Sequence, residues 1–292
     1  MGCCDLHFRR GSRGGRRSEA AVESERVPPG IDPTKAHPSR RYNYWLGGKD
    51  NFAVDRESAE MVASAFPTVG LAARENRAFL KRVVGYLAGE AGIGQFLDIG
   101  TGLPSAGNVH EVAQAIEPTS RIVYVDNDQV VLVHARALLT SAPEGRTAYI
   151  EADLRDPDRI LADPDLRRTL DMTRPVALML VATMHFIVDE DDPYGIFARL
   201  VSALPSGSHV VMTHATSDHL TPEQYAVSEE ANKRSGVPFR LRGSDEFARF
   251  FGGLELLPPG ITSVVEWRPD VPEADRPSIE DVSMLCAVAR VP

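Results

Sequence analysis

The chain reads Gln95-Phe96-Leu97-Asp98-Ile99-Gly100-Thr101-Gly102-Leu103-Pro104-Ser105-Ala106-Gly107-Asn108 where a strand pattern meets a helix start across a glycine turn. The apolar run is typical of a strand that is covered on both faces in a parallel sheet. Gly100 and Gly102 allow a sharp turn and let a ligand approach the backbone closely, although glycines also serve turn geometry alone. Asn108 and Glu111 form the pattern of an N-cap with its capping-box partner, which predicts a helix directly after the turn.

Two further strand patterns end in acidic residues. Residues 121–126 end in Asp126, which lies 24 positions after Gly102, and residues 147–153 end in Asp153. Open α/β sheets bind ligands at the carboxyl ends of their strands, where an acid can accept hydrogen bonds from ribose hydroxyls. The dinucleotide pattern Gly-x-Gly-x-x-Gly has Ser105 in place of its third glycine. We therefore expect a nucleoside ligand without a diphosphate.

The remaining patterns alternate strands with helices, which predicts right-handed crossovers and a mostly parallel α/β sheet. The expected strands are 96–99, 121–125, 147–151, 176–182, 208–214, 254–257, 264–267 and 284–290. The expected helices are 55–65, 71–88, 109–116, 129–140, 157–162, 193–204, 222–235 and 244–251. Thr221 is the predicted N-cap of the helix that opens at Pro222. The last three strands have little helix between them, which suits an antiparallel end of the sheet.

Several stretches resemble an actinobacterial family of uncharacterised S-adenosylmethionine (SAM)-dependent methyltransferases, long catalogued as a domain of unknown function. The resemblance spans roughly residues 27–291 and is carried by residues 42–52, 96–104, 107–111 and 260–262. It implies a Rossmann-like class I methyltransferase sheet, mostly parallel with the last strand antiparallel, and an N-terminal helical cap. It also implies SAM as the cofactor and S-adenosylhomocysteine as the product, and it leaves the methyl acceptor open.

The cofactor-binding residues that this resemblance implies for the core stand at strand ends: Asp98, Gly100, Gly102, Asp126, Asn127, Asp153 and Leu154. Asp126 would accept the ribose hydroxyls, Asp153 would border the adenine, and Asp98 would face the methionine ammonium group. Each charged hydrogen bond of this kind contributes about 1.5–3 kcal/mol. Asp153 has an alternative role as the N-cap of the short helix that follows it.

The N-terminal part divides into an arginine-rich tail and a cap. Residues 1–27 are poor in apolar residues, so we expect a disordered tail, in preference to a nucleic-acid-binding arm or an export signal. We expect residues 28–90 to form the cap and its helices, and residues 91–292 to form the SAM-binding core.

Residues 40–52 concentrate aromatic, amide and cationic groups. One interpretation is a packed segment with its polar groups in water. The resemblance favours a cap over the cofactor, with Tyr44 or Tyr42 near the ligand and Arg41 or Lys49 binding its carboxylate. Arg74 and Asn76, on the helix predicted at 71–88, are further candidates, although such residues are often simply solvated.

The fourth predicted strand runs into Val181-Ala182-Thr183-Met184-His185-Phe186, where the resemblance places the groups nearest the transferring methyl. His185 is a candidate general base because the ordinary pKa of histidine, about 6.5, suits proton transfer. The alternative is a histidine that packs and hydrogen-bonds at a strand end. The acidic run 189–192 reads as a solvated loop.

The prediction is a SAM-dependent methyltransferase that acts on an unidentified small molecule. The alternatives are a SAM-binding protein without transferase activity, such as a sensor or a partner subunit, and an NAD-dependent reductase. The reductase is disfavoured by Pro104-Ser105 in the turn and by the lack of an obvious Tyr-x-x-x-Lys pair. The sequence indicates neither the acceptor atom nor the oligomeric state.

The composition disfavours several other classes of protein. With 43% hydrophobic and 25% charged residues, the 292-residue chain is typical of a soluble globular protein, and its net charge of −9 argues against a nucleic-acid partner. Cys3, Cys4 and Cys286 have neither a disulfide framework nor a metal-binding spacing, so we expect a cytoplasmic protein without a metal. The longest apolar stretch, 175–188, is too short to span a membrane.

Overall fold

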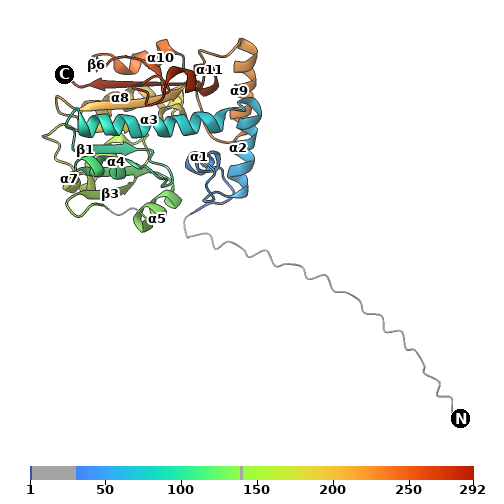
Figure 1. Ribbon diagram of the computed structural model, residues 1–292, viewed down its shortest axis with the longest axis horizontal. Coiled ribbons are helices and arrows are strands. Elements are labelled where there is room, and N and C mark those ends of the chain that lie inside the picture. The colour runs from blue at the N-terminus through green and yellow to red at the C-terminus, as the bar shows by residue number, and fades with distance from the viewer. Residues whose placement is uncertain (2–30, 139–140) are drawn as a thin grey trace.

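The computed structural model describes Met1, residues 31–138 and residues 141–292 of an α/β protein (Figure 1). The predicted tail, residues 1–27, lies outside the described residues apart from Met1. Within those ranges, no helix combines the length and the apolar character needed to cross a membrane.

The strands form a single sheet. They are β1 (Gln95–Ile99), β2 (Arg121–Asp126), β3 (Arg146–Glu151), β4 (Ala177–Leu180), β5 (His209–Ala215), β6 (Glu255–Leu256), β7 (Thr262–Ser263) and β8 (Met284–Arg290). Their order is β3-β2-β1-β4-β5-β8-β6, and β7 also pairs with β8. β1 to β5 are parallel, and β8 runs antiparallel to β5, β6 and β7. The predicted mostly parallel sheet with an antiparallel end is therefore confirmed.

Helices separate most of these strands. They are α1 (Pro38–Trp45), α2 (Ala53–Ala65), α3 (Val69–Gly89), α4 (Val109–Ile116), α5 (Gln129–Leu138), α6 (Pro157–Ala162), α7 (Pro164–Thr169), α8 (Pro193–Val201), α9 (Pro222–Arg234), α10 (Ser244–Ala248) and α11 (Ile279–Val282). Short 3-10 turns occupy Met184–Phe186, Asp189–Asp191, Arg249–Phe251 and Glu273–Asp275. The helix after the glycine turn has the predicted bounds, and the Asn108 N–H donates to Glu111 Oε2 at 3.2 Å.

The sheet is covered on both faces. Phe96 of β1 lies in a buried cluster with apolar residues of α3, α4 and α11. Leu97 and Ile99 lie in the cluster on the opposite face, with apolar residues of α6, α7, α8 and α10. Figure 1 shows α3 crossing the sheet as one long helix, with α1 and α2 beside its N-terminal end. Burial of each such side chain contributes about 1.5–3 kcal/mol, which explains why the strand pattern is an almost continuous apolar run.

Two strand predictions differ from the structure. The strand predicted at 264–267 is wrong. These residues form a turn, and the strand β7 lies directly before them, at Thr262–Ser263. Trp267 is fully buried in this turn and packs edge-on against Phe79, with 5.5 Å between the ring centroids. A buried turn therefore has the apolar composition of a strand. β4 also ends before the predicted residue 182, since Ala182 adopts a left-handed backbone with φ 56°.

Three helices were missed by the sequence patterns: α1, α7 and α11. α1 matters most for the site because it places residues 38, 41, 42 and 45 along one side of a helix. It begins at Pro38 after His37, whose Nδ1 accepts the Ser39 N–H at 3.3 Å. The first helix of the N-terminal cap therefore begins at Pro38.

Candidate functional site

A cavity of about 340 Å³ lies at the carboxyl ends of the parallel strands. The strand order reverses there between β1 and β4, which is where open α/β sheets bind ligands. Its walls come from the segments that follow β1, β2, β3 and β4, from the start of α1, from α3, and from residues 236–238. The predicted residues that line it are Asn76, Asp98, Gly100, Gly102, Asp126, Asn127, Asp153 and Leu154.

The glycine turn forms the floor of this cavity. Gly100 and Gly102 have φ values of 76° and 69°, in the left-handed region that favours glycine. A Cβ on Gly100 would lie 2.5 Å from Thr183 Oγ1, so this position also has no room for a side chain. A Cβ on Gly102 would meet no atom within 4 Å. The turn thus presents bare backbone to the ligand.

Asp126 is held in place by the turn that it faces. Its Oδ2 accepts the Gly102 N–H and its Oδ1 accepts the Asp128 N–H, each at 2.9 Å. A carboxylate has about four acceptor positions, so two remain for a ligand. Burial raises the pKa of Asp126, and hydrogen bonds from ligand hydroxyls would offset that cost. This arrangement fits the paired hydroxyls of a ribose.

Asp98 and Arg77 bring an acid and a cation to the same cavity. Burial raises the pKa of Asp98 to about 7, and the Arg77 guanidinium opposes this rise. Arg77 Nη2 donates to the neutral oxygens Gly107 O at 3.2 Å and Asn108 Oδ1 at 3.4 Å. The pair is suited to a zwitterion, with an ammonium group at Asp98 and a carboxylate at Arg77. Arg77 was not selected from the sequence, although it follows Asn76 and precedes Leu80 at helical spacing.

The third predicted acid lies beside the second. Asn127 Nδ2 donates to Asp153 Oδ2 at 2.9 Å, and His37 Nε2 lies 3.2 Å from Asn127 Oδ1. Asp153 is not the N-cap of α6, because Asp156 accepts the N-terminal Arg159 N–H of that helix. Asp153 and Asn127 therefore offer a joined acceptor and donor pair at this edge of the cavity.

Four other residues that were predicted to bind the cofactor do not line this cavity. Tyr44 donates its hydroxyl to Glu60, and Lys49 and Arg74 are exposed. Arg41 is buried and lines a second cavity instead. Of the described residues before α2, those that reach the first cavity are 36–39 and Tyr42. The Tyr42 hydroxyl accepts from Asn76 Nδ2 at 3.0 Å and donates to Ala73 O at 2.8 Å.

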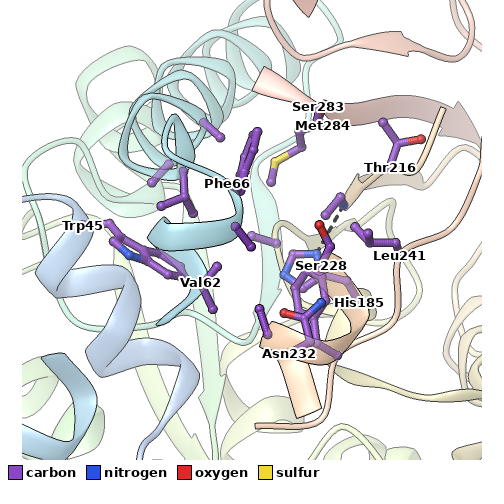
Figure 2. A pocket seen from close by; sticks show the side chains of 18 of the residues that line it. Trp45, Val62, Phe66, His185, Thr216, Ser228, Asn232, Leu241, Ser283 and Met284 are labelled. Carbon is purple, nitrogen blue, oxygen red and sulfur yellow. Dashed lines mark hydrogen bonds between the residues drawn. The ribbon is translucent and has the colours of Figure 1, made fainter. Parts of the chain in front are cut away.

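The second cavity, of about 100 Å³, adjoins the first. Tyr42, Ala182 and Phe186 line both cavities, so these three residues mark the place where the two meet. Ala182 has its strained left-handed backbone at this junction, and its N–H donates to Thr213 Oγ1 at 2.8 Å. Figure 2 shows side chains from the cap, from α2 and α9, and from the end of the sheet converging on this second cavity.

His185 belongs to the second cavity (Figure 2). It is 4% exposed, and its Nδ1 accepts the Ala215 N–H at 3.4 Å. Burial, together with His214, Arg41 and Arg242, holds the pKa of His185 well below its usual range. The ring is therefore neutral at physiological pH. Because Nδ1 accepts a hydrogen bond, the neutral ring carries its proton on Nε2.

Comparison with known proteins agrees with this geometry. The family described as S-adenosyl methyltransferase matches residues 24–292. A DUF574 family protein from Streptomyces avermitilis MA-4680 is 48% identical, with a TM-score of 0.85 over 89% of this chain and 99% of that one. A protein from Thermobifida fusca YX with a provisional methyltransferase name is 39% identical, with a TM-score of 0.83 over 92% of this chain and 99% of that one. No curated protein matches the chain.

The resemblance in residues 42–52 and 96–104 therefore identified the correct family. The cofactor of that family is SAM, whose nucleoside and amino-acid parts fit the acids and the arginine of the first cavity. The chain belongs to the S-adenosyl methyltransferase family and is a SAM-dependent methyltransferase.

Proposed function

We propose that the protein transfers the methyl group of SAM to a small molecule that occupies the second cavity. The observation that carries this proposal is the junction of the two cavities at Tyr42, Ala182 and Phe186. A methyl donor in one cavity and an acceptor in the other would face each other there. The second cavity is enclosed largely by apolar side chains, which favours a small organic acceptor over an exposed macromolecular one.

In this proposal the first cavity holds SAM through residues at its strand ends and through Arg77. Asp126 accepts the ribose hydroxyls, Asn127 and Asp153 border the adenine beside Leu154, and Gly100 and Gly102 present their backbone. Asp98 binds the ammonium group and Arg77 the carboxylate of the methionine part. When bound, SAM supplies a methyl carbon that forms a bond to an acceptor lone pair while its bond to sulfur breaks and the electron pair stays on sulfur.

The chain's own contribution to transfer is mainly positioning and exclusion of water. His185 lies in the acceptor cavity with a proton on Nε2 and a low pKa, so we assign it a hydrogen bond to the acceptor. This differs from the general base considered from its place in the sequence, because a histidine whose pKa lies well below 6.5 attracts a proton weakly. Phe186 and Tyr42 shield the junction between the cavities.

Calorimetric titration with SAM, S-adenosylhomocysteine and NAD tests the cofactor part of the proposal. We expect binding of the first two and its loss in Asp126→Ala. Asp245→Ala, an exposed acid that lines neither cavity, is the matched control and should bind normally. Unchanged affinity in Asp126→Ala would contradict the proposed site.

Transfer itself is tested by incubating the protein with methyl-labelled SAM and a panel of small acceptors. Product formation that is lost when the acceptor cavity is filled by Ala231→Phe, while SAM still binds, would support the proposal. Methylation that continues unchanged in this variant would contradict the placement of the acceptor. No observation in the structure favours either alternative drawn from the sequence, a binding protein without transferase activity or an NAD-dependent reductase.

A further inference from the structure

Arg41 is a buried cation that has no anionic partner among the residues that the structure describes. It is 2% exposed and lines the second cavity. A guanidinium has about five N–H donors. Of these, Nη1 donates to Ser58 Oγ at 3.4 Å, and Nε has no acceptor among the described residues. Burial of a charge without a partner is costly, so an unpaired guanidinium in the wall of a cavity points to a ligand that supplies the anion.

Asp55 is the acid whose charge acts on Arg41, but its carboxylate already has other partners. Asp55 is fully buried, and its carboxylate accepts the N–H groups of His37 and Phe52 at 2.9 and 2.8 Å. It also lies 3.5 Å from Arg40 Nη1. No carboxylate in the described ranges lies within 4.0 Å of the Arg41 guanidinium. Burial lowers the pKa of Arg41 to about 10, so its charge persists at neutral pH.

The side chains around Arg41 indicate the chemistry of the rest of the ligand. Its Cζ lies 5.6 Å from the centroid of the Trp45 ring and 5.9 Å from that of Phe186. The buried indole N–H of Trp45, which lines the same cavity, also has no acceptor in the described part of the chain. Most of the remaining wall is apolar, including Val62 and Phe66 (Figure 2).

We infer that the methyl acceptor is an apolar carboxylic acid whose carboxylate binds Arg41. One cation balances one negative charge, which favours a carboxylate over a phosphate dianion. The methionine carboxylate of SAM is the other possible anion, but Arg41 lines only the second cavity, and Arg77 lines the first. The inference rests on the proposed function, because it requires the second cavity to hold the acceptor.

Calorimetry on the protein saturated with S-adenosylhomocysteine tests this inference. The probes are benzoate, phenylacetate and 3-phenylpropanoate, each compared with its neutral amide. We expect the acids to bind about 10- to 100-fold more tightly than the amides, as a charged hydrogen bond predicts. Arg41→Met should remove this preference without changing the affinity for S-adenosylhomocysteine. Arg41→Lys, which keeps the charge, should retain part of it, and the exposed Arg74→Met is the matched control.

The possible results distinguish a failure of the proposed function from a failure of the inference about Arg41. If S-adenosylhomocysteine does not bind the wild-type protein, the proposed function fails. If it binds and the acids bind no better than the amides, or no acid binds at millimolar concentration, the inference fails alone. An Arg41→Met variant that loses affinity for S-adenosylhomocysteine but not for the acids would assign Arg41 to the cofactor and overturn the inference.

Discussion

Replacement of Asp98 by asparagine should make the ligand-free protein more stable and, at the same time, unable to bind SAM tightly. The physical reason is burial, which raises the pKa of Asp98 from 3.8 to about 7. Between about pH 4 and pH 7 the folded protein therefore keeps a proton that the unfolded chain has released. The destabilising effect of Asp98 grows as the pH rises through this window and is constant above it.

The magnitude follows from the shift. About three pKa units correspond to about 4 kcal/mol of lost stability at pH 8 and about 2 kcal/mol at pH 5, at 1.36 kcal/mol per unit. Asparagine is neutral at both pH values, so Asp98→Asn should recover most of these amounts. It should also weaken SAM binding at least tenfold, because the ammonium group loses its charged partner.

Urea unfolding of the two ligand-free proteins at pH 5 and pH 8 measures the first effect, and calorimetry with SAM measures the second. Asp245 is an exposed acid that lines neither cavity, so Asp245→Asn should change neither the stability nor the affinity for SAM. A variant that is no more stable than the wild type at pH 8, or a gain that does not shrink at pH 5, would refute the assignment of Asp98 as a buried carboxyl reserved for a cationic ligand.

Three other predictions concern the same site. Because bound SAM requires ionised Asp98, whose pKa is about 7, affinity should fall about tenfold between pH 8 and pH 6 in calorimetric titrations, and a flat profile would contradict this. Gly102→Ala should weaken SAM binding about tenfold and lower stability by the backbone penalty of about 1–2 kcal/mol. Gly92 has a similar φ of 68° but lies outside both cavities, so Gly92→Ala should show the stability penalty alone. His185 has a pKa well below 6.5, so the transfer rate at saturating SAM should stay level from pH 8 to pH 6. The rate should fall less in His185→Gln than in His185→Ala. A wild-type rate that drops with an apparent pKa of about 6.5 would instead support a general base.

The core of the fold could be predicted because its signals are local. Apolar runs, the glycine turn and the Asn108 cap each specify a strand, a turn or a helix start within a few residues, and the structure confirms them. The strand predicted at 264–267 failed because burial alone does not distinguish a packed turn from a strand. Trp267 is buried there by contacts with α3, which a local pattern does not contain.

The cap shows why individual site residues are harder to select. The chemically rich stretch 40–52 was not predicted to contain a helix. The helical spacing that places Tyr42 in the cavity wall and turns Tyr44 toward Glu60 was therefore not applied. The same spacing on α3 separates Arg77, which lines the first cavity, from the exposed Arg74. Which of several polar residues meets a ligand depends on the face of its helix and on the elements packed opposite.

The most direct test of the account is the crystal structure of the complex with S-adenosylhomocysteine. It should show the ribose on Asp126, the amino-acid part between Asp98 and Arg77, and the sulfur directed toward Ala182 and Phe186, with the second cavity left open to an acceptor. Density for the ligand in the second cavity, or a sulfur directed away from the junction, would contradict the division of the site into a cofactor cavity and an acceptor cavity.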